Sequence, residues 1–265
     1  MSNLVGILSI SNASGLKYPY LAVVKNLSQL CTNVVVGLDP TYSVDLAEIL
    51  ALKLDNVVMV DSVWNRDNRA AGSEIALQMD KMIDYAQKMF SPDWVVVMQA
   101  DEVLHEDAFD SLRASLDFCS PDITGLSTER IYFWRDLKTV RTDWNADLVR
   151  IFRPGYYSFM AENTDKAGMY SAQVKEGIQM KSPFLIYHYS RVDDPNVISQ
   201  RVRNLDTLFH PESSLTPVDQ LPAYDFLPRA YDNYSMVESP PKVEGIFAEF
   251  FGTHPKVMLD FYGEK

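Results

Sequence analysis

Short apolar runs alternate with amphipathic stretches over the first hundred residues. Four of the apolar runs have the length and the β-branched or aliphatic character of buried strands, at 4–10, 34–36, 57–60 and 94–98. Apolar residues at helical spacing lie between them, at 19–31, 44–54 and 73–90. Buried strands separated by amphipathic helices predict an α/β fold with a doubly wound, mostly parallel sheet.

The pattern changes after Ser120 and Pro121. Strand-like pieces without helices between them follow at 131–134, 148–152 and 156–159, and another lies at 184–189. These pieces predict a mixed or antiparallel extension of the sheet. A helix is expected over about 196–209, and six prolines within 211–241 predict a long ordered loop or flap. We therefore expect two halves, 1–120 and 121–265, fused into one domain.

Composition narrows the classes of function. The net charge of −12 opposes attraction to nucleic-acid backbones and anionic membranes, although a local basic groove is compatible with it. The two cysteines, Cys31 and Cys119, are expected to be reduced core residues. The chain has neither a basic signal-peptide region at its start nor an apolar run long enough for a membrane span, so we expect a cytoplasmic protein. Dinucleotide-binding and P-loop glycine motifs are also absent from the sequence.

Polar residues follow the predicted strands, where open parallel sheets bind their ligands. They are Ser11, Asn12, Asp39, Asp61, Asn65, Gln99, Asp101 and Glu102. Hard divalent cations prefer carboxylate oxygens, and Asp101 lies nearest the end of the fourth strand. The sequence therefore predicts a metal site at Asp101. Glu106 and Asp107 are interpreted differently, as charges in the first turn of the next helix.

The order of these stretches resembles family 2 glycosyltransferases of the GT-A fold. The resemblance rests on Ser11-Asn12 after the first strand, Gly37 to Pro40, Trp64 to Arg69, and the strand from Trp94 to Glu102. Two further segments are similar to a bacterial and phage subgroup of that family, at 186–192 and 251–258. Gln99 departs from the general family, which has Asp there, but Gln-Ala-Asp-Glu is familiar in the subgroup.

The resemblance implies roles for individual positions. Asp39 would contact the base or ribose of a nucleotide-sugar donor, which is expected to be UDP-linked. Asn65 and Arg69 would hold the nucleotide and its pyrophosphate, with Ser11, Asn12 and Gln99 beside it. Asp101 and His188 would bind Mn²⁺ or Mg²⁺ bridging the two phosphates.

The acceptor side is less defined. An inverting transferase needs a carboxylate to deprotonate the acceptor hydroxyl, and the candidates are Asp147 and Glu102, with Glu129 and Glu162 as competitors. Arg150 and Arg153 lie in a strand expected to be half-exposed and face either phosphate or solvent. The acceptor is a carbohydrate or another hydroxyl compound, and modified DNA is disfavoured by the negative charge.

Two other functions stay open from the sequence. A nucleotidyltransferase also uses carboxylates and Mg²⁺ on such a sheet, but it would carry a glycine-rich basic loop, for which only 14–17 is available. A non-catalytic nucleotide- or sugar-binding protein with the same fold is the third interpretation. The donor sugar, the stereochemical outcome and the oligomeric state are not predicted by the sequence.

Overall fold

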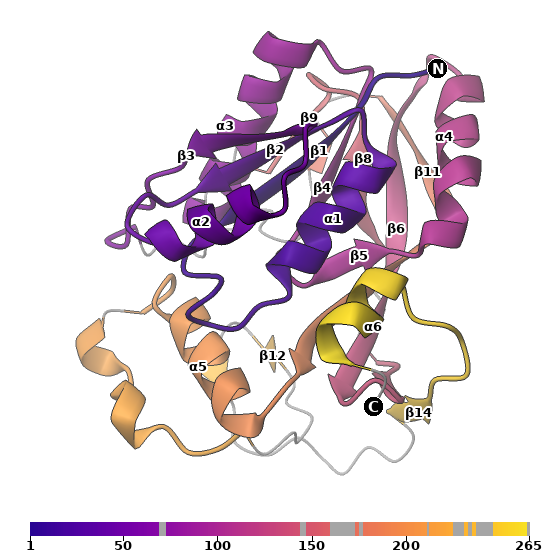
Figure 1. The fold of residues 1–265 in the computed structure, drawn as a ribbon. Coiled ribbons are helices and arrows are strands. Elements are labelled where there is room, and N and C mark those ends of the chain that lie inside the picture. Colours follow the sequence, from indigo (N-terminus) through magenta and orange to yellow (C-terminus); the bar gives the residue numbers. More distant parts are fainter. Residues whose placement is uncertain are drawn as a thin grey trace.

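A single ten-stranded sheet runs through the protein (Figure 1). The computed structural model describes residues 1–68, 73–143, 147–159, 173–174, 177–210, 212–224, 231–232, 235–236 and 246–263. The main path of the sheet has the order β14-β7-β6-β8-β4-β1-β2-β3, and β11 and β5 join it beside β6. The sheet therefore continues from the first half of the chain into the second.

The parallel part of the sheet comes from the first hundred residues. Its strands are β1 (Leu4–Ile10), β2 (Asn33–Leu38), β3 (Val57–Asp61) and β4 (Trp94–Met98), all mutually parallel. The helices between them are α1 (Tyr20–Leu30), α2 (Ser43–Ala51) and α3 (Ser73–Phe90). The predicted α/β alternation is thus confirmed.

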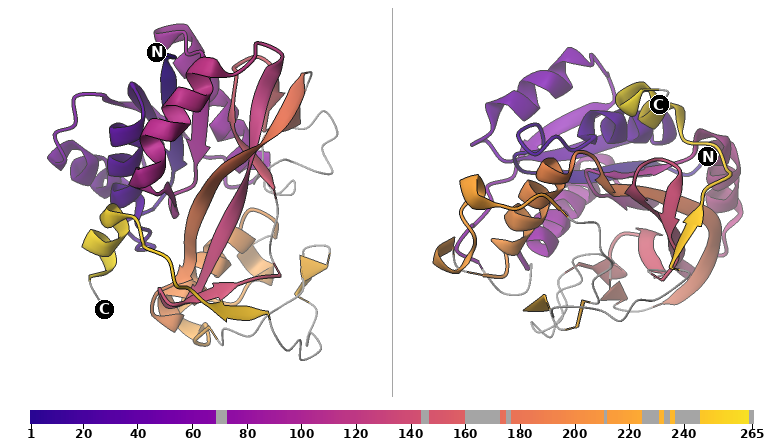
Figure 2. Two further views of the ribbon diagram at one scale, coloured as in Figure 1. Left: turned by 90° about the vertical axis from the view of Figure 1, so that its right-hand side faces the viewer. Right: turned by 90° about the horizontal axis from the view of Figure 1, so that it is seen from below.

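Helices cover both faces of the parallel strands, as Figure 2 shows. On one face α1 and α2 share a core with α4 (Phe109–Phe118) and the C-terminal α6 (Lys256–Tyr262). On the other face α3 buries Ala76, Met79, Met82, Ile83 and Ala86 against the strands. Side chains of alternate strand positions enter the two cores, because successive residues of a strand point to opposite faces. The doubly wound arrangement follows from this alternation.

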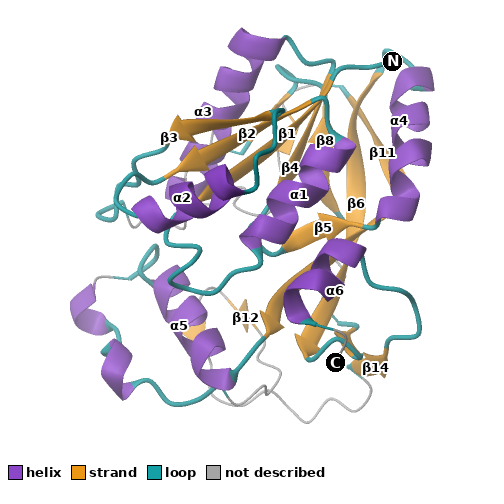
Figure 3. Ribbon diagram, viewed as in Figure 1, coloured by secondary structure: helices purple, strands orange, loops and turns teal. Residues whose placement is uncertain are grey.

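The second half extends the sheet mainly with antiparallel pairs (Figure 3). The strand β8 (Leu148–Phe152) pairs antiparallel with both β4 and β6 (Ile123–Arg135). The long strand β11 (Ile178–Val192) is parallel to β6 and antiparallel to β5 (Glu102–Leu104). The pieces predicted at 131–134 and 184–189 are therefore parts of two much longer strands. The mixed extension itself is confirmed.

Shorter elements complete the described chain. The edge of the sheet carries β7 (Thr139–Arg141) and β14 (Phe247–Glu249), and β9 (Tyr157–Ser158) pairs with β10 (Gln173–Val174). The predicted helix at 196–209 is α5 (Pro195–Asp206), and the Asp194 side chain caps it by accepting from the Asn196 amide. The 3-10 helix η1 (Glu106–Ala108) and α6 were not predicted.

The proline-punctuated segment is described in part. It contains the 3-10 helices η3 (Glu212–Ser214) and η4 (Val218–Gln220) and the hairpin of β12 (Tyr231–Asp232) and β13 (Ser235–Met236). Residues 211, 225–230, 233–234 and 237–241 of the predicted flap lie outside the described residues. Across the described chain, none of the helices combines the length and the apolar character that crossing a bilayer requires.

Candidate functional site

The carboxyl ends of β1, β2, β3 and β4 lie along one edge of the sheet, because these strands are parallel. Two groups of side chains gather there. We call the first the Asp39 cluster, which consists of Ser11, Asp39 and Arg66. We call the second the Asp101 cluster, which consists of Asp101, Glu102, Arg130, Arg150, His188, Arg191 and Arg201. The first supplies hydrogen bonds, and the second is dominated by charge.

The Asp39 cluster is a continuous hydrogen-bonded chain. The Ser11 hydroxyl donates to Asp39 Oδ2 at 2.8 Å, and Arg66 Nη2 donates to Ser11 Oγ at 2.6 Å. The Thr41 amide donates to Asp39 Oδ1 at 3.1 Å. The Arg66 guanidinium lies 5.5 Å above the ring of Trp64, which fixes its direction. The predicted residues Ser11 and Asp39 are therefore in contact.

The other residues predicted to bind the nucleotide-sugar are not part of the Asp39 cluster. Asn12 adopts a left-handed backbone conformation (φ 58°) in the loop after β1. Asn65 is exposed, its amide N–H donates to Glu74 Oε1 at 3.0 Å, and its side chain accepts from the Asp67 amide at 3.0 Å. Arg69 lies outside the described residues. Arg66, rather than Asn65, is thus the member of that stretch that contacts Ser11.

A tight turn after β4 presents Asp101. The Glu102 amide donates to the Gln99 carbonyl at 3.1 Å, and the Gln99 amide donates back to Glu102 Oε2 at 2.9 Å. The Asp101 carbonyl accepts from the Tyr189 amide of β11 at 2.9 Å. This turn joins the end of the parallel strands to β11, so both halves of the chain fix the position of Asp101.

His188 lies opposite Glu102 in the ladder between β5 and β11. Its Nε2 is 3.7 Å from Asp101 Oδ1, and its Nδ1 lies 3.3 Å from Ser190 Oγ. The ring packs edge-on against Tyr132, with centroids 4.6 Å apart. The structure therefore brings together the two residues predicted as metal ligands, although they are 87 positions apart in the chain.

Glu102 is wholly buried and engaged by cations. Its Oε1 accepts from Arg130 Nη1 at 3.0 Å and from Arg150 Nη2 at 2.9 Å. Its other oxygen accepts from the Gln99 amide. The buried carboxylate of Glu102 is thus held by two guanidiniums and one backbone amide, which fixes the turn in place. A catalytic role for Glu102 stays a prediction, and it would require one of these pairs to open.

Burial shifts the pKa values of Asp101 and His188 in opposite directions. Burial, with the nearby Glu102, raises the pKa of Asp101 to about 6, while Arg201, Arg191 and Arg130 counteract this rise. Burial lowers the pKa of His188 well below its usual value, and Arg130, Arg191 and Arg150 add to the decrease. His188 is thus neutral at physiological pH, which is the form in which imidazole binds metals.

Arg201 of α5 ties the loop after β1 to the Asp101 cluster. Its Nε donates to the Leu16 carbonyl at 2.9 Å, and its Nη2 donates to the Lys17 carbonyl and to Asp193 Oδ2, the latter at 2.7 Å. The guanidinium lies 4.7 Å from the ring of Tyr18. Burial and the charge of Asp101 raise the pKa of Tyr18 to about 12. The loop 11–18 therefore spans from the Asp39 cluster to the Asp101 cluster.

The predicted general base Asp147 precedes β8 and is exposed. Its Oδ1 lies 3.7 Å from Lys181 Nζ on β11, and Glu129 pairs with the same lysine. The third candidate, Glu162, lies outside the described residues. The role of Asp147 in deprotonating an acceptor stays a prediction.

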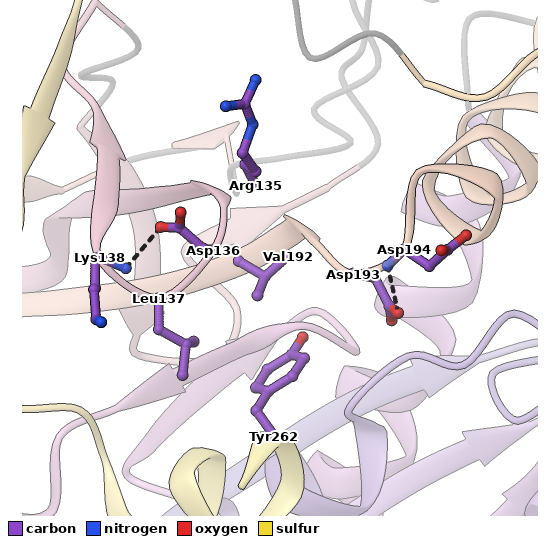
Figure 4. A pocket seen from close by; sticks show the side chains of 8 residues that line it. All are labelled: Arg135, Asp136, Leu137, Lys138, Val192, Asp193, Asp194 and Tyr262. Carbon is purple, nitrogen blue, oxygen red and sulfur yellow. Dashed lines mark hydrogen bonds between the residues drawn. The ribbon is translucent and has the colours of Figure 1, made fainter. Parts of the chain in front are cut away.

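A pocket of about 410 Å³ lies at the carboxyl ends of β6 and β11 (Figure 4). Its lining residues come from the turn between β6 and β7, the end of β11 and α6, and they are Arg135, Asp136, Leu137, Lys138, Val192, Asp193, Asp194 and Tyr262. In Figure 4 the Tyr262 hydroxyl points toward the pocket. Asp193 belongs both to this pocket and to the pair with Arg201, so the pocket adjoins the Asp101 cluster.

The donor atoms at Asp101 and His188 offer a divalent cation part of its coordination shell. Asp101 and a neutral His188 offer one carboxylate oxygen and one imidazole nitrogen on converging side chains. Glu102 is committed to Arg130 and Arg150, and the described residues contain no group of three or more His, Cys, Asp or Glu that could hold a metal. The pair therefore fits a cation that takes its remaining ligands from substrate phosphates and water.

Three of the residues at the site were missed or left open by sequence reasoning. Arg201 was seen only as part of the apolar stripe of its helix, and an arginine within such a stripe signals a buried cation. Arg150 was expected in a half-exposed strand, yet β8 is buried along its whole length. Arg130 lies in a strand whose exposure alternates, so nothing local distinguishes it from a surface charge.

Comparisons with known proteins give similarity at the level of fold. No family model matches the chain, and no curated protein matches it. Solved structures match at low identity, and residues 1–349 of S. aureus TarS share 14% identity over 78% of this chain and 65% of that chain, with a TM-score of 0.42. The same TarS fragment is also known in complex with UDP-GlcNAc.

Two nucleotidyltransferases match comparably. A cytidylyltransferase from Leptospira borgpetersenii covers 58% of this chain and 61% of that chain at 16% identity, with a TM-score of 0.38. A putative glucose-1-phosphate thymidylyltransferase from Bacillus anthracis covers 70% and 71% at 12% identity, with a TM-score of 0.36. The chain thus spans less than two thirds of the TarS fragment and of the cytidylyltransferase. Similarity at this level leaves the function to be inferred from the residues of the site.

Proposed function

We propose that the protein is a glycosyltransferase that moves a sugar from a nucleotide-sugar to an acceptor hydroxyl. The family resemblance implies that the donor is UDP-linked. The observation that carries the proposal is the convergence of Asp101 and His188, with Oδ1 and Nε2 3.7 Å apart, at the sheet edge that also holds the Asp39 cluster. A neutral imidazole beside a carboxylate at the carboxyl ends of parallel strands suits a phosphate-bearing ligand.

We assign the two clusters to different parts of the donor. The Asp39 cluster supplies hydrogen-bonding groups for the nucleoside, with Ser11, Asp39 and Arg66 already in one network. The Asp101 cluster receives the diphosphate. Mn²⁺ or Mg²⁺, when bound by Asp101, His188 and the phosphates, would stabilise the charge that develops on the departing nucleoside diphosphate. Asn12, Gln99 and the loop 11–18 line the path between the clusters in this proposal.

The reaction balances without a further reactant. The bond between the anomeric carbon and the diphosphate oxygen breaks, and the electron pair leaves with the nucleoside diphosphate. The acceptor oxygen bonds to the anomeric carbon, and its proton passes to a carboxylate. Asp147 is our candidate for that carboxylate, because it is exposed while Glu102 is sealed between arginines. We take the acceptor to be a carbohydrate or another hydroxyl compound.

A thermal-shift screen with nucleoside diphosphates and nucleotide-sugars, each with and without Mn²⁺, tests the proposal first. Ligands that bind only the native state raise the midpoint of unfolding. Uridine compounds are expected to stabilise the protein more with Mn²⁺ than without it. If no nucleotide stabilises the protein under either condition, the proposed function is wrong.

Product analysis then separates the enzyme classes. Incubation with nucleotide-sugar is expected to release nucleoside diphosphate, whereas a nucleotidyltransferase running on a sugar phosphate and a nucleoside triphosphate would release pyrophosphate. Asp101→Asn is expected to lose the release of nucleoside diphosphate. Asp107→Asn is the matched control, because Asp107 lies six residues on with a side chain that is 85% exposed. Equal losses in both variants would argue against a special role for Asp101, and nucleotide binding without turnover would indicate a binding protein.

A further inference from the structure

The pocket at the carboxyl ends of β6 and β11 is separate from the residues assigned to the nucleoside and to the acceptor proton. Its volume is about 410 Å³, toward the lower end of the range of about 300–1,000 Å³ in which proteins bind small molecules. Asp147 lies near Lys181 at the start of β11, whereas Val192, the last residue of that strand, lines the pocket. A ligand in the pocket is therefore not placed for deprotonation by Asp147.

Two walls of the pocket are held in place by hydrogen bonds of their own. On one wall, Asp136 Oδ1 accepts from the amides of Lys138 and Thr139 at 2.9 and 2.8 Å. On the other wall, Asp194 Oδ1 accepts from the amide and from the side chain of Asn196, both at 2.9 Å. The second oxygen of each carboxylate, Oδ2, accepts from none of the described residues. Each wall thus carries one carboxylate oxygen that has no donor within the described chain.

Between the two walls the lining is apolar, and Figure 4 shows Leu137, Val192 and Tyr262 there. The Tyr262 hydroxyl is buried, points toward the pocket and has no hydrogen-bond acceptor among the described residues. The Arg201 guanidinium interacts with this hydroxyl, but a guanidinium only donates and cannot accept the phenolic proton. Because buried polar groups usually have a partner, the orphaned hydroxyl indicates a ligand that accepts from it.

The chemistry of the lining favours a hydroxyl compound. The open carboxylate oxygens need donors, and the Tyr262 hydroxyl needs an acceptor. An ammonium group only donates and a phosphate ester dianion only accepts, whereas an alcohol does both. The lining carries Arg135 and Lys138 as well as three carboxylates, of which Asp193 is paired with Arg201, so it does not single out a charged ligand. A ring that combines hydroxyl groups with apolar C–H faces matches both the polar walls and the apolar floor.

We propose that this pocket binds a neutral sugar, whose hydroxyl groups donate to Asp136 and Asp194 and accept from Tyr262. The inference goes beyond the proposed function, because the sugar is expected to bind without a nucleotide and without a metal ion. The pocket adjoins the Asp101 cluster through Asp193, which accepts from Arg201 Nη2 at 2.7 Å. A sugar bound there lies next to the position assigned to the diphosphate and occupies a site of its own.

Titration with methyl glycosides, followed by saturation-transfer NMR in EDTA and without nucleotide, tests the inference. The probes are the methyl α-glycosides of glucose, galactose, mannose and N-acetylglucosamine. At least one is expected to bind with a Kd of about 1–10 mM, the range for a ligand of this size. Tyr262→Phe is expected to raise that Kd about 2- to 10-fold, because it removes one hydrogen bond and keeps the ring. Asp136→Asn is expected to raise it by at least as much, because a charge-assisted acceptor is lost.

Each variant has a matched control. Tyr85→Phe is the control for Tyr262, because Tyr85 is also half-buried but lies on α3, which covers the opposite face of the sheet. Asp93→Asn is the control for Asp136, because Asp93 is also exposed and accepts from a backbone amide but precedes β4, at the other edge of the sheet. Both controls are expected to bind within about twofold of the unmodified protein. Tyr262→Phe is expected to keep the midpoint of thermal unfolding, because the hydroxyl it loses has no acceptor.

The possible results separate the inference from its alternatives. No binding of any glycoside at about tenfold above the expected Kd, an unchanged Kd in either pocket variant, or equal weakening in Tyr262→Phe and Tyr85→Phe would overturn it. It would also be overturned if inorganic phosphate or ethanolamine bound more tightly than every glycoside and depended on Tyr262, because the pocket would then serve a charged ligand. Failure of the proposed function looks different: glycosides bind and depend on Tyr262, but no nucleotide stabilises the protein.

Discussion

Asp39 and Asp101 follow neighbouring parts of the same parallel sheet and are equally buried, each with 6% of its surface exposed. Asp39 is saturated, since one oxygen accepts from Ser11 and the other from the Thr41 amide. The Oδ1 atom of Asp101 lies 3.7 Å from His188 Nε2, and the charges of nearby guanidiniums act on the carboxyl group. The two aspartates therefore have the same burial but differ in their hydrogen bonding: both oxygens of Asp39 accept hydrogen bonds, whereas Asp101 is surrounded mainly by charges.

The difference separates a buried carboxylate that is hydrogen-bonded within the protein from one that is not. A buried carboxylate that is fully hydrogen-bonded is stable without help from outside the protein. A buried carboxylate whose pKa is raised to about 6 is stabilised when a cation or a proton arrives. Glu102 extends the comparison, because it is buried even more deeply than Asp101 but is neutralised by Arg130 and Arg150. The neighbouring carboxylates 101 and 102 thus differ: Glu102 is held in ion pairs with two arginines, and Asp101 faces His188.

Removal of the Glu102 charge is expected to have the largest effect on stability. Glu102→Gln keeps the shape of the side chain and leaves Arg130 and Arg150 without their carboxylate in a buried site, which costs about 3–5 kcal/mol. Urea denaturation measures the free energy of unfolding. The control is Glu129→Gln, whose exposed pair with Lys181 is screened by solvent and is expected to contribute little to stability. Similar losses in the two variants would contradict the structural role of Glu102.

Asp101→Asn is expected to separate activity from stability. Turnover of nucleotide-sugar is expected to fall about 100-fold, equivalent to about 2.7 kcal/mol, because the charged ligand of the proposed metal ion is lost. The folded protein raises the pKa of Asp101 from 3.8 to about 6, so the carboxyl group contributes stability below pH 4 that is lost as pH rises through 6. Asp101→Asn has no carboxyl group at this position, so this pH-dependent loss of stability is absent from the variant.

The pH dependence provides the check on Asp101. Relative to the unmodified protein, the free energy of unfolding of Asp101→Asn is expected to increase between about pH 4 and pH 7 and to level off above that range. Denaturation curves at a series of pH values measure this difference. A decrease over the same range would mean that the charged carboxylate is stabilised in the fold, as Asp39 is by its hydrogen bonds, and the comparison between the two aspartates would fail.

The sequence predicted the parallel half of the fold because that half is locally encoded. Each strand is a run of apolar residues, and each helix shows an apolar stripe, so 4–10, 94–98 and their neighbours were placed within a few residues. For the second half, the sequence predicted a mixed or antiparallel extension of the sheet but not the lengths of its strands. The strands β6 and β11 run far beyond the apolar pieces at 131–134 and 184–189. Their outer parts were not recognised, because polar residues interrupt the apolar pattern of β6 and the start of β11 is largely exposed.

The site shows the same limit. Asp101 and His188 were selected as partners through the family resemblance, and the pairing of β5 with β11 brings them together. The arginines near them lie on two strands and a helix that are far apart in the chain. No spacing pattern in the sequence predicts that Arg130, Arg150 and Arg201 are buried in the same region. Burial of a charge depends on tertiary contacts, so the sequence pattern indicates neither the burial of Arg130 nor that of Arg201.

Asp39→Asn is expected to have a moderate effect. An amide in this position keeps one acceptor oxygen but cannot satisfy both the Ser11 hydroxyl and the Thr41 amide, so the free energy of unfolding falls by about 1–2 kcal/mol. Unlike Asp101→Asn, this loss is expected at pH 7 as well as at pH 5. Urea denaturation at the two pH values measures it. A gain in stability at pH 7 would show that Asp39 carries the same kind of strain as Asp101.

Ser11→Ala is expected to have the smallest effect and to act on nucleotide binding. The hydroxyl links Arg66 to Asp39, and its removal frees the guanidinium from one contact while the position over Trp64 remains. The loss of one hydrogen bond of about 0.5–1.5 kcal/mol corresponds to a Kd for nucleoside diphosphate that rises about 2- to 10-fold. Ser14→Ala is the control, because Ser14 contacts Asp45 through its backbone amide, which the substitution keeps. If Ser11→Ala instead weakened pyrophosphate as strongly as nucleoside diphosphate, the Asp39 cluster would serve the phosphates, and the division of the donor between the two clusters would have to be abandoned.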